Sequence, residues 1–204
     1  MINRPQLRAV LFAVHGGVAL VCGLAILYLR LLAANPFFSA VAIVIALLLC
    51  GAAITLAGIA DWFAAAEAGR RNLRQILLYA LAGLCFVASG SFLGFSSSAT
   101  LQILLLLVIA HGLIFGGLGL LTALRLRHKG IDAIVIVFFA VLSITVAGWM
   151  AGRIRDFSDR SALAWVGAYL CIVGAKLIFF AGDERYHALH PRPPALASPL
   201  PESK

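Results

Sequence analysis

A few ionisable residues interrupt the apolar stretches of this chain, and they are the first candidates for chemistry. Asp61 follows Gly58 by three residues, and Lys176 lies at a similar depth in another stretch. A charge at the centre of a membrane helix costs about 2.5–3.5 kcal/mol, so such groups usually have a partner. Asp61 and Lys176 could therefore form a proton- or ion-linked pair. Alternatively, Lys176 extends toward the lipid headgroups and Asp61 caps the edge of the bundle.

His111 is the second candidate, because it lies near the middle of its apolar stretch. Ser89 and Ser91 lie at a comparable depth in the preceding stretch. This combination resembles the serine–histidine pair of rhomboid intramembrane proteases, in which a base activates a nucleophile. The rest of that pattern is missing, since rhomboids place the histidine two helices later and no oxyanion-hole donors are recognisable. We therefore expect His111 to make a polar contact between helices, or to titrate near its ordinary pH range.

A cofactor or metal site is not predicted. His15 lies about six residues into its stretch and His111 about thirteen from the end of its own, a difference in depth of roughly 10 Å, too large for two axial ligands of one haem. The cysteines lack Cys-x-x-Cys spacing and fall inside apolar stretches, where thiols act as small fillers. His187 and His190 belong to a proline-rich tail and are expected to be solvated. We predict a protein that is not an enzyme.

The elements that carry these residues are expected to be membrane helices. Hydrophobic residues make up 63% of the chain and charged residues 12%, against about 25% charged in soluble domains. Crossing a bilayer takes about 20 apolar residues, and backbone groups in lipid must bond within their own segment. The fold class is therefore an all-α integral membrane protein. Its six predicted spans are Ala9–Leu29, Phe37–Ala60, Ile76–Leu93, Ala99–Leu124, Ile131–Met150 and Ser161–Ala181.

Glycines recur along the chain with a fixed period. In one set, successive glycines are 58 residues apart. A second set repeats this interval, except that its first interval is longer, and a loop at residues 30–38 can hold the additional residues. The sets are Gly58, Gly116 and Gly174, and Gly23, Gly90 and Gly148. A fixed period identifies the repeated unit, here a two-helix hairpin in three copies at about 9–74, 75–129 and 130–185. All copies run in the same direction, which predicts pseudo-threefold symmetry about the membrane normal. The glycines are expected to let helices approach closely.

Basic residues in the short loops predict the orientation. Nine lie on one side of the membrane and four on the other, which places both termini in the cytoplasm. The nine are Arg4, Arg8, Arg70, Arg71, Arg74, Arg125, Arg127, Lys129 and Arg185, and the four are Arg30, Arg153, Arg155 and Arg160. The net charge of +8 then reflects topology and attraction to anionic lipid headgroups. Nucleic acid is not an expected partner, because no continuous basic face forms.

Residues 1–185 are expected to form a single membrane domain that begins with a retained signal anchor. Residues 186–204 are expected to form a disordered, proline-rich cytoplasmic tail.

The region 9–185 resembles the HdeD-like short-repeat family of bacterial inner-membrane proteins. In that family each hairpin has a glycine in its first helix, and in its second a glycine followed by an acidic or polar position and then basic residues. The six glycines above match these places, Asp61 matches the acidic position, and Gly119 and Leu177 depart from it. Basic ends match at Arg70-Arg71 and at residues 125–129. The resemblance implies membrane placement and an association with acid stress, with no established reaction.

Three hypotheses for function follow. The leading one is a non-enzymatic bacterial inner-membrane protein that supports acid or envelope stress resistance through lipid or protein contacts, including contacts with its own copies. The second is a small transporter or channel, which needs inward polar residues at successive depths. Candidates for such a path are few: His15, Thr55, Ser89, His111, Ser143 and Thr145. The third is an intramembrane enzyme centred on His111.

The predicted orientation can be tested by labelling from outside the cell. Cysteines introduced as Asn72→Cys or Lys129→Cys should resist a membrane-impermeant maleimide in intact cells, because both positions are expected on the cytoplasmic side. Asp156→Cys, in a loop expected on the opposite side, should be labelled. Labelling of the first two variants and protection of the third would reverse the topology.

Overall fold

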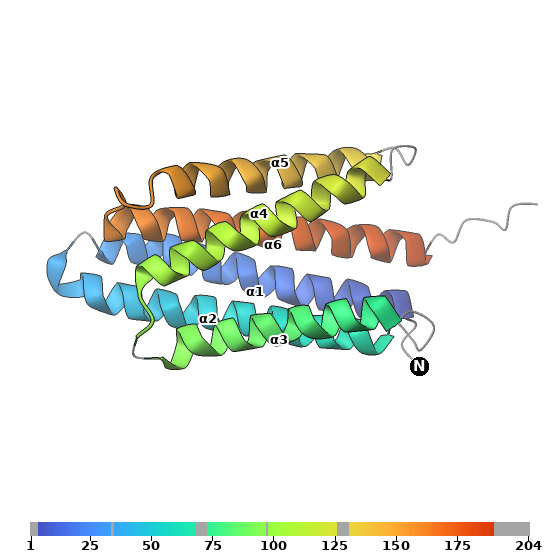
Figure 1. The fold of residues 1–204 in the computed structure, drawn as a ribbon, viewed down its shortest axis with the longest axis horizontal. Helices are drawn as coiled ribbons and strands as arrows, with labels where there is room; N and C mark the ends of the chain where they lie inside the picture. The colour runs from blue at the N-terminus through green and yellow to red at the C-terminus, as the bar shows by residue number, and fades with distance from the viewer. Residues whose placement is uncertain (1–3, 34, 68–72, 97, 126–130, 190–204) are drawn as a thin grey trace, which may run out of the picture.

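In the computed structural model, six α-helices account for nearly all of the residues that the structure describes, 4–33, 35–67, 73–96, 98–125 and 131–189 (Figure 1). No strand occurs among these residues. The helices are α1 (Arg4–Leu32), α2 (Pro36–Glu67), α3 (Leu73–Phe95), α4 (Leu101–Arg125), α5 (Ile131–Gly152) and α6 (Asp159–Leu189). They run alternately in opposite directions, so the start of α1 and the end of α6 lie at the same end of the bundle (Figure 1).

Five of the helices in the described part of the chain are long and apolar enough to cross a membrane. Their spans are Ala9–Leu32, Phe37–Phe63, Leu101–Leu121, Ile134–Gly152 and Asp159–Gly182. The apolar part of α3, Ala80–Phe95, is shorter, although the whole helix has 23 residues. Large apolar side chains are exposed on every helix, for example Val21 and Leu106. An all-helical chain with an apolar exterior confirms the predicted class of multi-pass membrane protein.

Three helices extend well beyond the predicted spans. The helix α1 begins at Arg4, before Ala9, and α2 continues to Glu67, beyond Ala60. The helix α6 continues to Leu189, beyond the expected end of its span at Ala181 and of the membrane domain at residue 185. The predictions for Arg70, Arg71, Arg127 and Lys129, and for the tail from residue 190, fall outside the described residues.

The closest packing joins α1 to α6, α2 to α3, and α4 to α5. In Figure 1, α1 and α6 lie in the middle of the view, α5 lies along one side and α2 and α3 along the other, and α4 runs obliquely in front of α6 from α5 toward α3. The hairpins expected from the period are helices α1–α2, α3–α4 and α5–α6. The two helices of one expected hairpin therefore pack less closely on each other than on a helix of a neighbouring hairpin.

Glycines allow the backbones of two of these pairs to approach closely. A Cβ atom added to Gly23 on α1 would lie 2.8 Å from the backbone nitrogen of Cys171 on α6, and one added to Gly174 would lie 2.7 Å from the oxygen of Gly16. Between α2 and α3, a Cβ on Gly58 would lie 2.5 Å from the oxygen of Gly83. Any side chain at these positions would force the helices apart, as expected where small residues hold membrane helices together.

The same α2–α3 contact continues at the second glycine set. A Cβ atom added to Gly90 on α3 would lie 2.6 Å from the oxygen of Gly51 on α2, and one added to Gly51 would lie 2.7 Å from the oxygen of Gly90. The α2–α3 pair therefore has two close backbone contacts, about two helical turns apart.

The α4–α5 pair follows the pattern with one change. A Cβ on Gly116 would lie 3.0 Å from the oxygen of Ala140, and a Cβ on Gly112 would lie 2.7 Å from the Cβ of Ala147. Gly148, which the period places at a helix contact, has no atom within 4 Å of an added Cβ. The preceding residue, the fully buried Ala147, makes the contact in its place. The face of α5 that packs on α4 is therefore offset by about one residue from the face that the glycine period predicts.

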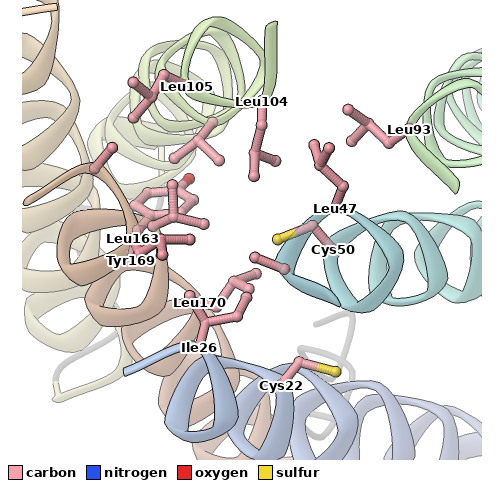
Figure 2. Close-up of a cluster of buried hydrophobic side chains, with 14 of the residues drawn as sticks. Cys22, Ile26, Leu47, Cys50, Leu93, Leu104, Leu105, Leu163, Tyr169 and Leu170 are labelled. Carbon is pink, nitrogen blue, oxygen red and sulfur yellow. The ribbon is translucent and has the colours of Figure 1, made fainter. Parts of the chain in front are cut away.

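The half of the bundle away from the chain termini is filled by apolar side chains. Ile26, Leu104 and Leu163 are completely buried there, and they come from α1, α4 and α6. Figure 2 shows these side chains converging from several helices, with Leu47 of α2 and Leu93 of α3. This core closes the end of the bundle where the loops α1–α2, α3–α4 and α5–α6 lie.

The glycine contacts predict opposite effects for the same substitution at two sites. Gly51→Ala should destabilise the protein by about 1–3 kcal/mol, because overpacked helices must shift. Gly148→Ala, where a methyl group meets open space, should be neutral or stabilising by up to about 1 kcal/mol, because alanine favours the helix. Thermal unfolding of the purified protein in detergent, followed by circular dichroism, measures both. Equal effects of the two substitutions would contradict the observed packing.

Candidate functional site

A cavity of about 210 Å³ lies between the helices. Its lining side chains come from α1, α2, α3, α4 and α6, and most of them are apolar. The polar groups in this lining are His15 from α1, Ser89 from α3, His111 from α4, Tyr169 from α6 and the thiol of Cys85. A mostly apolar cavity with a few converging polar groups is the usual form of a small-molecule site.

Small side chains on α2 help to leave this space open. His111 and Phe115 project from α4, and Tyr169 from α6, whereas α2 presents Ala53 and Ala57 beside Ile54. Two alanines near three rings leave space unfilled in an otherwise closely packed interior.

The central interaction of the site is a hydrogen bond of 2.5 Å between Nδ1 of His111 and the hydroxyl of Tyr169. No other partner for either group is found among the described residues. If the tyrosine donates to Nδ1, only the Nε2–H of the histidine stays unbonded. If the histidine donates, both the tyrosine proton and Nε2 stay unbonded. Because unbonded buried polar groups are costly, we assign the proton to the tyrosine and an Nε2–H to His111.

Aromatic rings hold the His111 imidazole in place. It stacks on Phe115 with ring centroids 4.5 Å apart, and Phe115 stacks in turn on Phe86 of α3 at 5.5 Å. Tyr169 meets the imidazole edge-on. Stacking from one side and a hydrogen bond from another restrict the ring to one orientation.

His15 lines the same cavity as His111. Along the α1–α6 contact, Gly23 lies against Gly167 and Gly16 lies against Gly174. His15 therefore lies about two helical turns from the level of Tyr169, the partner of His111, as the expected difference in depth implies.

The suggested pair of Asp61 and Lys176 is not joined in the structure. Both side chains are partly buried, but no ion pair connects them in the part of the chain that the structure describes. Trp62, beside Asp61, donates a hydrogen bond of 3.1 Å from Nε1 to the oxygen of Ala80. The end of α2 is therefore fixed to α3.

Ser89 and His111, the serine–histidine pair suggested by the sequence, both belong to the cavity lining. The described residues nevertheless show no hydrogen bond between the two, and the imidazole Nδ1 is bonded to Tyr169 instead. A base-activated nucleophile needs that direct bond. Within the described ranges no group of three or more histidine, cysteine or acidic residues could hold a metal ion.

A continuous polar path through the bundle is also not seen in the described residues. Thr55 bonds back to the oxygen of Gly51 on its own helix at 2.8 Å, Thr145 is exposed on the outside, and Ser143 is buried at the α4–α5 contact. Leu104 and Leu163 fill the bundle on one side of the cavity. The cavity is thus closed toward the end of the bundle opposite the chain termini.

Comparisons with protein-family models, curated proteins and solved structures found no match to this chain.

Sequence reasoning identified His111 and His15 but missed Tyr169, Phe86 and Phe115. A signal for the tyrosine was present, because Tyr169 follows His111 by 58 residues, which is the glycine period itself.

The hydrogen bond predicts a specific loss of stability. Tyr169→Phe leaves the imidazole Nδ1 unbonded in the core and should cost about 1–3 kcal/mol, measured by thermal unfolding in detergent. Tyr28→Phe, at an exposed tyrosine of α1, is the matched control and should have no effect. In a double-mutant cycle, Tyr169→Phe and His111→Phe should be non-additive by about 1 kcal/mol; additive losses would show that the two groups do not interact.

Proposed function

We propose that this chain is a six-span bacterial inner-membrane protein with both termini in the cytoplasm, built from three copies of one helical hairpin. The burial of positions one period apart supports the repeat. Leu47, Leu105 and Leu163 are exposed by 7%, 2% and 0%. Each comes from the second helix of its proposed unit, so α2, α4 and α6 surround a common axis.

The next equivalent positions along these helices behave alike. Cys50, Val108 and Val166 are all buried, and one turn further Ala53, His111 and Tyr169 all line the cavity. The close helix pairs are consistent with this arrangement, since α2 packs on α3, α4 on α5, and α6 on α1. In each pair the second helix of one unit packs on the first helix of the next, and the third unit closes on the first.

For the function itself, we propose a non-enzymatic role in resistance to acid or envelope stress, as in the HdeD-like family that the sequence resembles. The observation that carries this choice is the apolar core around Leu104, Leu105 and Leu163, which leaves no continuous polar path for ions in the described bundle. The exposed apolar faces offer contacts with lipid, with other membrane proteins or with further copies of the chain.

The cavity favours a second candidate function, a small transporter. Transporters bind their substrates near the middle of the membrane between helices, and the cavity lies between helices in the interior of the bundle. A transporter must also open the cavity to both sides, which requires the apolar core to separate.

Survival and flux measurements distinguish the two functions. Deletion of the gene should lower survival after acid shock at least tenfold, and the wild-type gene should restore it. The purified protein in liposomes should conduct no protons or small ions above protein-free liposomes. A specific flux would establish the transporter instead, and unchanged survival would remove the stress role.

A further inference from the structure

We propose that the cavity binds the head of a quinone-class lipid, a flat, uncharged ring that carries carbonyl oxygens. The proposal goes beyond the stress-resistance role and stands on the geometry of the cavity alone. Four features support it: an unbonded donor, an aromatic wall, the cavity's size, and an entrance that faces the lipid.

The unbonded donor is the Nε2–H of His111. The hydroxyl of Tyr169 satisfies Nδ1, and no acceptor for Nε2 is found among the described residues, although His111 lines the cavity. A buried donor without a partner costs about 1–3 kcal/mol. A ligand carbonyl oxygen within the cavity would remove that cost.

The wall and the charges favour a flat, neutral ring. Phe86 and Phe115 border the cavity beside the imidazole, and aromatic rings pack favourably on flat ligands. A carboxylate ligand would carry a full charge into a mostly apolar lining, which is costly. A cationic ligand would meet His15 and no acidic side chain among the lining residues.

The size of the cavity restricts the ligand to a single ring. Its volume is about 210 Å³, and an engineered apolar cavity of about 150 Å³ binds benzene. A substituted six-membered ring fits this space, whereas haem or a four-ring sterol is too large. The isoprenoid tail of a quinone would have to remain outside the cavity.

The entrance lies between α3 and α4, which are not among the closely packed pairs. Cys85 of α3, and Ala110 and Ile114 of α4, line the cavity and are also exposed on the apolar surface of the bundle. A lipid-soluble head can therefore enter sideways from the bilayer while its tail stays in lipid. An entrance of this kind suits a membrane-borne ligand better than a water-soluble one.

Binding can be tested with the full-length protein in nanodiscs and decyl-ubiquinone as the probe. Isothermal titration should show saturable binding near one ligand per chain. The probe should also slow alkylation of Cys85 by N-ethylmaleimide at least tenfold, since Cys85 borders the entrance and is the exposed cysteine of the four. His111→Phe, which keeps an aromatic ring but removes the donor, should weaken binding at least tenfold.

A pair of matched substitutions keeps the test independent of folding defects. Ala110→Phe should obstruct the entrance and abolish both readouts. Ala88→Phe places the same side chain at another exposed alanine, on α3, that does not line the cavity, and should bind like the wild type.

Three outcomes would overturn the proposal: no saturable binding to the wild type, equal binding by the Ala110→Phe variant, or equally tight binding of decanoic acid or decane. The last would show that the cavity accepts an acyl chain. None of these outcomes bears on acid survival, so the quinone site and the proposed function fail separately.

Discussion

Close approach of helix backbones is the constraint on which the rest of this structure depends. Where Gly51 faces Gly90, and Gly23 faces Cys171, an added methyl group would lie within 3 Å of the opposite backbone. Inside a bilayer, water does not drive helices together, so association depends on such packing. The glycines bring α1 to α6 and α2 to α3, and these contacts fix where every interior side chain points.

Positions one glycine period apart on α2, α4 and α6 carry similar side chains at one level of the interior and unlike side chains at another. At the level of Leu47, Leu105 and Leu163 the three inner helices contribute alike, and the core is solid. Further along, α4 and α6 contribute His111 and Tyr169, whereas α2 contributes Ala53. The backbone positions correspond but the volumes do not, so a cavity and a polar contact arise together. A difference in side-chain volume at one level of the bundle is thus enough to create a site.

The sequence was sufficient to predict the helical membrane class and most of the glycine contacts, because both depend on local composition and on a period. It did not predict which helices pair, since a period defines the repeated unit but not the neighbour on which that unit packs. Gly148 illustrates a finer limit, because a rotation of one residue gives its contact to Ala147. Tyr169 was missed for a different reason. Its partner His111 lies 58 residues earlier in the chain, and this relation is noticed only when positions one glycine period apart are compared.

The pairing of α1 with α6 has a consequence for how the protein is made. The helix α1 is synthesised before α6, yet the backbone on which it packs most closely lies around Gly167 and Gly174 of α6. During synthesis the glycine face of α1 is therefore available to other membrane helices or to an insertion chaperone. The α1–α6 contact can form only after the four helices between them have been made.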